Sequence, residues 1–226
     1  FDDIGVLRDL IAQVEADSAV RVLVVSARGR SFSAGYDLAD LGRPGRGREA
    51  DGLALLAETV AALATCRVPS VAALNGPVFG GATDLALACD FRIGVASCKL
   101  RMPAAQFGLH YYHGGLQRYV ERLGLGAAKR LFLLAATVDA EELHRIGYLD
   151  EIVPEAAALT ARTAEIAASL AAAADPQVLQ SMKACLNRIA AGDRDPTQAD
   201  EAWARTRRSA AVGRAVAAAR NATVRP

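Results

Sequence analysis

Three stretches of the chain place apolar side chains at the spacing of one helical face. Intervals of three and four residues bring such side chains to the same side of an α-helix. They occur at Ile4, Leu7, Ile11 and Val14, at Leu53, Leu56, Val60 and Leu63, and at Leu179, Met182, Leu186 and Ile189. The pattern predicts three amphipathic helices, and nearly the whole chain after Glu155 has helical character.

Short apolar runs alternate with helical segments in the first half of the chain. VRVLVV (20–25) is continuous and rich in valine, which is typical of a strand covered on both faces. SVAAL (70–74) and FRIGV (91–95) predict two further strands, and GATDLALACD (81–90) predicts a short buried helix between them. Helix and strand alternate early and helices dominate late, which indicates an α/β core with a helical C-terminal part.

Composition and charge narrow the class of protein. The chain has 26 basic and 25 acidic residues, a formal net charge of +1. A chain whose main partner is nucleic acid is usually far more basic, so that class is disfavoured. No run approaches the ~18 uncharged apolar residues of a membrane span. We therefore expect neither nucleic acid nor membrane as a partner.

The cysteines and the N-terminal residues give an expectation about the cellular compartment of the protein. Metal-like spacing is absent among Cys66, Cys89, Cys98 and Cys185. No basic-then-apolar leader opens the sequence, so we interpret the thiols as reduced core residues of a cytoplasmic protein. The sequence begins at Phe1 within a helical pattern, and we expect the natural N-terminus to lie upstream.

The glycine-rich stretch NGPVFGGATDL (75–85) follows a predicted strand and opens a predicted helix. Its spacing almost matches the phosphate-binding loop of nucleotide hydrolases, but Ala82 replaces the lysine that contacts the phosphates. A tight turn that needs backbone freedom is one explanation of the glycines. The other is an anion site, because N–H groups at a helix start are unpaired and the helix dipole is positive there.

Three long blocks resemble the enoyl-CoA hydratase/isomerase, or crotonase, family. They are SFSAGYDL (31–38), NGPVFGGATDLALACDFRI (75–93) and LGLGAAKRLFLLAATVDAEELHRIGYLDEIVP (123–154). The resemblance implies the α/β crotonase (ClpP/crotonase) fold, a spiral of ββα turns with a helical C-terminal region. We accordingly predict a spiral core at 1–174, without the family's first strands, and a helical oligomerisation region at 175–226.

The resemblance also implies an acyl-CoA site built from backbone groups. Members of the family hold the thioester oxygen between two backbone N–H groups and make or use a thioester enolate. By position, these donors fall on Tyr36 and Gly81. A glycine suits the second position, because a side chain there would crowd the thioester. Removing one such donor typically costs roughly 3–4 kcal/mol of activation free energy.

The family's CoA-binding segment falls on Ala34, Asp37 and Leu38, where backbone groups receive the adenine. A loop or helix cap is an equal alternative for Asp37. The basic loop GRPGRGRE (42–49) could meet CoA phosphates, although a solvated loop fits its arginines better; these are Arg43, Arg46 and Arg48. Coenzyme A arrives with the substrate, so the resemblance implies no separate cofactor and no metal.

The acidic positions depart from the family pattern. Hydratases use two glutamates to activate one water across the double bond. The first maps to Asp84, about one helical turn after Gly81, and the second maps to Ala104, which cannot move a proton. Two-carboxylate hydration is therefore disfavoured, and so is an isomerase that relies on the second position. The alternative for Asp84 is a helix-start carboxylate satisfied by the dipole or by an arginine.

The segment FGLHYYHGGLQ (107–117) carries the remaining candidate chemistry. Its usual family residues are small, and Tyr111 aligns with a tyrosine of the family's methylmalonyl-CoA decarboxylases. Decarboxylation needs no base to form the enolate, but it needs a group that orients the carboxylate and a proton donor. We predict that Tyr111 and His110 point inward for these tasks, with Asp84 as the third catalytic residue. A packed pocket wall or a subunit contact is the alternative.

The other histidines and aromatic residues are interpreted structurally. We expect His113 to cap the helix that begins near Gly114 and His144 to lie at the surface of an amphipathic helix. Three aromatic residues are expected to serve packing: Tyr119, Tyr148 and Trp203.

Three functional hypotheses remain open at this point. The first is an acyl-CoA decarboxylase or isomerase that stabilises an enolate, the second a hydratase with displaced acids, and the third an acyl-CoA-binding protein without chemistry. The resemblance further implies a homotrimer or a dimer of trimers, and the helical face that includes Met182 and Leu186 could supply its contacts.

Overall fold

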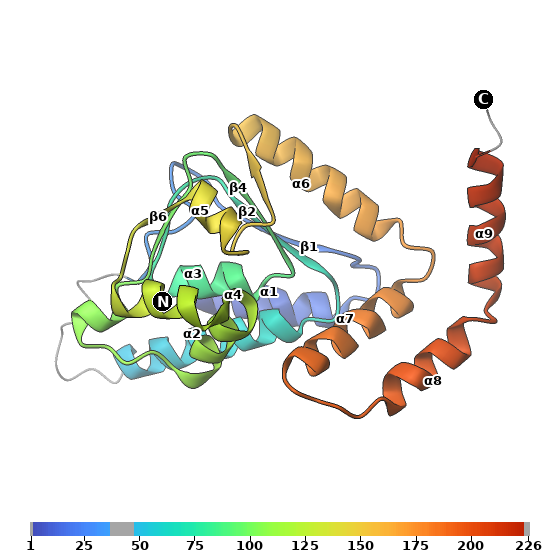
Figure 1. The fold of residues 1–226 in the computed structure, drawn as a ribbon, viewed down its shortest axis with the longest axis horizontal. Helices are drawn as coiled ribbons and strands as arrows, with labels where there is room; N and C mark the ends of the chain where they lie inside the picture. Colours follow the sequence, from blue (N-terminus) through green and yellow to red (C-terminus); the bar gives the residue numbers. More distant parts are fainter. Residues whose placement is uncertain (1, 37–47, 224–226) are drawn as a thin grey trace.

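The computed structural model describes residues 2–36 and 48–223, which form two β-sheets with helices around them (Figure 1). The strands are β1 (Leu23–Ser26), β2 (Ser70–Leu74), β3 (Val78–Phe79), β4 (Phe91–Val95), β5 (Lys99–Arg101), β6 (Val138–Asp139) and β7 (Glu151–Val153). The helices are α1 (Asp2–Ala16), α2 (Arg48–Thr65), α3 (Gly81–Ala88), the 3₁₀-helix η1 (Ala104–Phe107), α4 (His113–Leu133), α5 (Ala140–Arg145), α6 (Ala156–Ala171), α7 (Pro176–Ala190), α8 (Thr197–Thr206) and α9 (Ala210–Thr223).

The larger sheet is parallel throughout, with the strand order β1-β2-β4-β7. β2 and β4 coincide with the predicted strands SVAAL and FRIGV, and they pair with Val71 opposite Phe91 and Leu74 opposite Gly94. Every residue of β2 is buried, as expected for an inner strand of a parallel sheet. The smaller sheet has the order β3-β5-β6, and its β3 leads directly into α3.

The prediction for the first strand is wrong in one respect. β1 covers Leu23–Ser26 instead of the whole run 20–25, and half-buried residues alternate with exposed ones along it. Val24 is 39% exposed. Among the described strands, β1 pairs with β2 alone, so it is an edge strand. A valine run indicates a strand but does not show whether both of its faces are covered.

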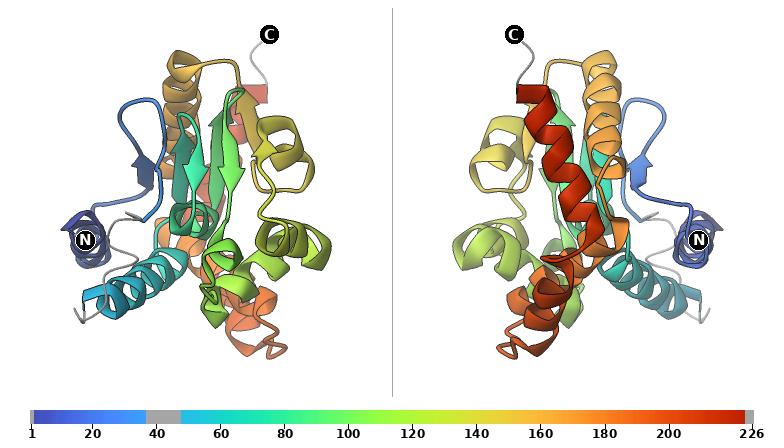
Figure 2. Two further views of the ribbon diagram at one scale, coloured as in Figure 1. Left: turned by 90° about the vertical axis from the view of Figure 1, so that its left-hand side faces the viewer. Right: turned by 90° about the vertical axis from the view of Figure 1, so that its right-hand side faces the viewer.

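Helices enclose the larger sheet from different directions. Helix α6 contacts all four of its strands, whereas α1, α2, α3 and α4 pack on one another away from α6 (Figure 1). Figure 2 shows the same separation from two further sides. Val60 and Leu63 of the predicted stripe on α2 are fully buried, and so is most of α3, which confirms both predicted helices.

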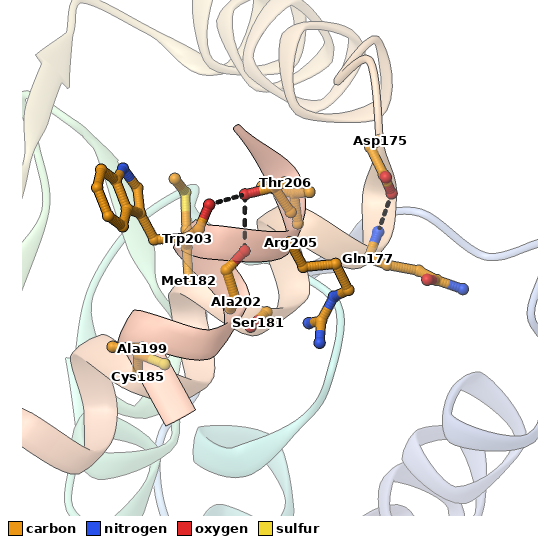
Figure 3. Close-up of a pocket in the computed structure, with 11 residues that line it drawn as sticks. Asp175, Gln177, Ser181, Met182, Cys185, Ala199, Ala202, Trp203, Arg205 and Thr206 are labelled. Carbon is orange, nitrogen blue, oxygen red and sulfur yellow. Dashed lines mark hydrogen bonds between the residues drawn. The ribbon is translucent and has the colours of Figure 1, made fainter. Parts of the chain in front are cut away.

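The last three helices differ from the core in how they expose apolar groups. α8 and α9 extend away from the sheets (Figure 1). On α7, Met182 and Leu186 are 57% and 66% exposed, and Ile189 is exposed as well. A cavity of about 240 Å³ lies between α7 and α8 (Figure 3). Trp203 lines it and is 62% exposed, so the expectation that Trp203 is a packing residue is wrong.

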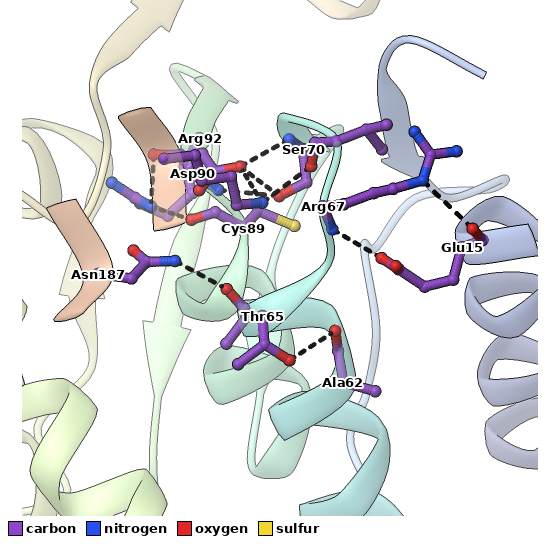
Figure 4. Close-up of polar contacts among 12 residues, drawn as sticks. Glu15, Ala62, Thr65, Arg67, Ser70, Cys89, Asp90, Arg92 and Asn187 are labelled. Carbon is purple, nitrogen blue, oxygen red and sulfur yellow. Dashed lines mark hydrogen bonds and ion pairs between the residues drawn. The ribbon is translucent and has the colours of Figure 1, made fainter. Parts of the chain in front are cut away.

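Polar side chains of α7 connect this helix to the core (Figure 4). Asn187 Nδ2 donates to the carbonyl oxygen of Ala64, 3.2 Å away. Lys183 Nζ donates to the carbonyl oxygen of Val68 at 2.8 Å and pairs with Asp90 Oδ2 at 2.6 Å. α7 therefore turns its polar side inward and its apolar side outward. None of the helices in the described part of the chain combines the length and hydropathy needed to cross a membrane.

Candidate active site

The loop that carries Tyr36 is held against β3 by backbone hydrogen bonds. The N–H of Phe32 donates to the carbonyl of Pro77 at 2.9 Å, and the N–H of Phe79 donates to the carbonyl of Ser33 at 3.0 Å. These bonds extend the edge of β3 with the segment SFSAG. The residue that follows this segment therefore lies close to the residues that follow β3.

Two glycines allow the two loops to touch. Gly35 has φ of 87°, and a Cβ there would lie 2.8 Å from the carbonyl oxygen of Phe79. Gly80, at φ of 57°, is the N-cap residue of α3, and a Cβ there would lie 3.8 Å from the Cα of Gly35. Any other residue would be strained at both positions. The glycines thus bring Tyr36 and Gly81 to one place.

Tyr36 and Gly81 line the same cavity of about 280 Å³. Gly81 is the first residue of α3, and the first N–H groups of a helix have no intrahelical acceptor. A side chain on Gly81 would collide with Leu56 of α2, which also lines the cavity. Asp3 of α1 contributes a carboxylate to the lining, a position that the sequence patterns did not indicate.

The predicted CoA-binding segment is described only at its start. Ala34 is exposed beside the cavity-lining residues Ser33 and Gly35. Asp37 and Leu38 lie outside the described residues, as do Arg43 and Arg46 of the basic loop. Their predicted contacts with coenzyme A stay predictions.

Asp84 lies in the first turn of α3, and its side chain is fully buried. Arg118 of α4 pairs with it, Nη1 to Oδ1, at 2.6 Å. The Tyr111 hydroxyl donates to Asp84 Oδ2 at 3.3 Å, and the Tyr112 hydroxyl donates to the same oxygen. We call these four residues the Asp84 network. They are not among the described residues that line the cavity of Tyr36 and Gly81, although the neighbouring Leu85 is.

The phenols of the Asp84 network hold their protons firmly. Burial, and next the negative charge of Asp84, raise the pKa of Tyr111 well above its ordinary 10.0. The same two causes raise the pKa of Tyr112. Burial lowers the pKa of Arg118, but the charge of Asp84, the hydrogen bond to it and the interaction with Tyr112 together outweigh burial and leave that pKa raised. At neutral pH the carboxylate therefore faces one cation and two neutral donors.

The expectation about which side chains point inward is wrong for the histidine. His110 is exposed, and its Nδ1 lies 2.8 Å from the carbonyl oxygen of Tyr111. Tyr111 and Tyr112 both turn inward, since the hydroxyls of both reach Asp84, and α4 begins directly after them at His113. The prediction that His113 caps this helix is also wrong: Tyr112 is the N-cap, and no side chain caps it.

Aromatic residues behind α3 form the rigid support of the site. Tyr119 is fully buried and hydrogen-bonds Thr83 Oγ1, and Tyr148, also fully buried, donates to the carbonyl of Thr83 at 2.8 Å. Both confirm the packing role predicted for them. His144 is exposed, as predicted. Ala104, at the position of the second family glutamate, is a buried residue of η1.

Sequence reasoning anticipated an arginine for Asp84 without identifying it. Arg118 lies 34 residues further along the chain, on another helix. Tyr112 was likewise not singled out from its neighbour. The available signal was general, because a carboxylate in a buried helix needs a compensating cation.

Comparisons with known proteins identify the family of this chain. The family model described as Enoyl-CoA hydratase/isomerase matches residues 6–207. The crotonyl-CoA hydratase of Syntrophomonas wolfei is 32% identical over 148 residues, 65% of this chain and 57% of that protein. The probable enoyl-CoA hydratase EchA12 of Mycobacterium tuberculosis is 34% identical over 188 residues, 79% of this chain and 65% of that protein.

A solved structure supports the same assignment. DspI of Pseudomonas aeruginosa has a TM-score of 0.80 and 32% identity, covering 90% of this chain and 77% of that chain. The chain belongs to the enoyl-CoA hydratase/isomerase family and has the crotonase fold. It spans less than two thirds of the length of the two hydratases named above.

Proposed function

We propose that this chain binds an acyl-CoA thioester and stabilises its enolate between the N–H groups of Tyr36 and Gly81. The observation that carries the proposal is the single cavity that both residues line. The N-terminus of α3 adds a positive dipole at that point, which favours a developing oxyanion. Family membership supports the same chemistry.

Decarboxylation or double-bond isomerisation fits the acidic groups better than hydration by two carboxylates. The family resemblance puts the second acid position at Ala104, and Asp84 is fully buried with both oxygens engaged. In decarboxylation, the electron pair of the broken C–C bond enters the enolate as carbon dioxide leaves. The enolate then needs one proton at the α-carbon, which a neighbouring phenol or a water can supply. Decarboxylation therefore requires no base to form the enolate, whereas isomerisation requires a base that removes a proton.

Hydration is the second candidate, and the names of two relatives favour it. The proteins from Syntrophomonas wolfei and Mycobacterium tuberculosis are both named as hydratases. In this chain, a hydratase would have to draw on an acid outside the two usual positions. Asp3, which lines the cavity, is one such carboxylate.

We propose that the partner of this chain is a further copy of itself. The outward apolar side of α7, with Met182 and Leu186, continues toward Trp203 of α8. Exposed apolar groups that gather in this way are typical of contact surfaces. A second and third copy of this chain would bury them.

A panel of thioesters tests the proposed function. The chain is incubated with malonyl-type, 3-enoyl, 2-enoyl and aromatic CoA thioesters, and the products are identified by mass spectrometry. Loss of carbon dioxide from a malonyl-type substrate, or migration of a double bond without a mass change, supports the first candidate. Gain of one water by a 2-enoyl substrate as the main reaction supports the second. Absence of product from every class contradicts both.

A further inference from the structure

The two ends of α3 are held by arginines one turn apart on α4. Arg118 Nη1 binds Asp84 in the first turn of α3 at 2.6 Å. Arg122 Nη1 donates to the carbonyl oxygens of Leu87 and Cys89 at the other end, at 2.6 Å and 2.5 Å. Residues four apart on a helix lie on one face, so both arginines reach α3 together. Arg118 differs from Arg122 in that its acceptor is a charged side chain.

Glycine lets α4 approach the Asp84 network closely. A Cβ on Gly115 would collide with the ring of Tyr111 and would lie 2.9 Å from Asp84 Oδ2. Asp84 therefore lies against the first turn of α4, where the helix dipole is positive and stabilises a negative charge. The Tyr111 and Tyr112 rings pack against each other at a tilt of 41°, with centroids 4.8 Å apart. The carboxylate is thus enclosed by groups that favour its charged form.

Three donors surround the Asp84 carboxylate. Oδ1 faces a guanidinium that does not lose its proton, and Oδ2 accepts from two hydroxyls. Loss of Arg118 would leave the buried carboxylate with the hydroxyl donors alone. The side chain has no exposed surface through which water could replace them.

We propose that Arg118 is a positioning residue, which keeps Asp84 ionised so that its carboxylate fixes the directions of the Tyr111 and Tyr112 hydroxyls. Asp84 is then a fixed acceptor and carries no proton during turnover. The proposal rests on the proposed function for its kinetic consequence, because that function makes a phenol a candidate proton donor to the enolate. Its electrostatic part concerns the free protein and needs no substrate.

Infrared difference spectroscopy of the full chain tests the electrostatic part. In Arg118→Gln, Asp84 loses its cation in a buried place, so we expect it to take up a proton at neutral pH. A protonated-carboxyl band then appears against wild type and disappears in Arg118→Gln/Asp84→Asn. Arg118→Lys keeps the charge and shows no band. Arg122→Gln, the matched control, removes the other arginine contact between α4 and the α3 segment and shows no band either.

Two further readouts distinguish positioning from a purely structural role. With the substrate found by the thioester panel, Arg118→Gln should lower kcat by about 10²-fold with little change in KM, as for a displaced reacting group. Arg118→Lys should restore most of kcat, and Arg122→Gln should stay close to wild type. If Arg118→Gln does not fold, the tyrosines of Asp84→Asn are titrated by ultraviolet absorbance instead. The absorbance of phenolate should then rise at a lower pH in Asp84→Asn than in wild type.

The outcomes separate this proposal from the proposed function. No carboxyl band in folded Arg118→Gln, or phenols in Asp84→Asn that titrate as in wild type, would overturn the positioning role. A kcat that depends on titration of Asp84 would overturn it too. A thioester panel without product would refute the proposed function, while the infrared result would still decide whether Arg118 keeps Asp84 ionised.

Discussion

The two ends of helix α3 each hold a carboxylate, yet the carboxylates have different partners. Asp84, in the first turn, accepts from two phenols and pairs with an arginine, all of them side chains. Asp90 lies just beyond the last turn, where its Oδ2 accepts from the backbone N–H of Ser70 at 2.8 Å and from the Ser70 hydroxyl at 3.0 Å. Lys183 of α7, whose Nζ lies 2.6 Å from Asp90 Oδ2, completes this second group.

The helix dipole explains part of the difference. A negative charge is favoured in the first turn of α3 and disfavoured beyond its last turn. The helix dipole alone therefore favours a carboxylate at Asp84, whereas the carboxylate of Asp90 depends on Ser70 and Lys183 for its stabilisation. The end with Asp84 faces two phenols and the guanidinium of Arg118. The other end ties the strand β2 and the helix α7 together.

The largest expected effect concerns the first residue of α3. Gly81→Pro removes the proposed oxyanion donor, and proline is well tolerated at the first position of a helix. Because its ring needs the space of Leu56, both Gly81→Pro and Gly81→Ala are made in a Leu56→Ala background. We expect kcat of the proline variant to be about 10²–10³-fold below that of the alanine variant. Steady-state kinetics measures this, and equal kcat values would remove Gly81 from the oxyanion site.

The second prediction concerns the opposite end. Lys183→Met leaves Asp90 with only its Ser70 donors in a largely buried place, where the side chains of Lys183 and Asp90 are 9% and 16% exposed. Removing one partner of a buried ion pair costs about 3 kcal/mol. The free energy of unfolding, measured in urea, should therefore fall by that amount. The double variant Lys183→Met/Asp90→Asn should recover part of the loss. A lower kcat for folded Lys183→Met would show that the two ends are not independent.

A third prediction uses alkaline pH to distinguish the contributions of the two ends of α3 to stability. Burial raises the pKa of the Cys89 thiol from 9.0 to about 12 and raises the pKa of Tyr112 above 10.0. Because both folded-state pKa values are raised, the associated stability is complete below the unfolded values and is lost as pH rises toward the folded ones. Each group should lower the free energy of unfolding by up to about 1.4 kcal/mol per pH unit.

The two windows differ, which makes the comparison measurable. Urea unfolding between pH 8 and 11 should show a decline from pH 9 that becomes shallower in Cys89→Ala. Tyr112→Phe should alter the decline only above pH 10. If Tyr112→Phe changed the dependence of the free energy of unfolding on pH below pH 9, the assignment of the earlier decline to thiols such as Cys89 would be contradicted.

The smallest effect on stability is expected far from both ends. Leu186→Lys on α7 changes a side chain that is 66% exposed, so the free energy of unfolding of the single chain should change by less than about 0.5 kcal/mol. Sedimentation velocity should nevertheless show a smaller assembly if α7 joins copies of the chain. Leu133→Lys, at a position 69% exposed on α4, is the control and should leave the assembly unchanged. Identical sedimentation of both variants would argue against α7 as the contact.

Much of this architecture could be predicted because local patterns dictate it. SVAAL and FRIGV are apolar runs of strand length, and both became inner strands at those residues. The glycines before α3 indicated a backbone anion site, and the structure brings Tyr36 and Gly81 to one cavity. The edge position of β1 was missed because a strand's neighbours are set by the whole sheet.

The sequence by itself determined the family and the inner strands SVAAL and FRIGV, since both depend on which residues occur and at what spacing. Only the tertiary structure decided that both tyrosines of the HYYH segment turn toward Asp84, that His110 faces away, and that Arg118 supplies the cation. The physical reason is that burying a charge requires partners in three dimensions. Those partners come from whichever helix packs alongside, and spacing along the chain does not reveal it.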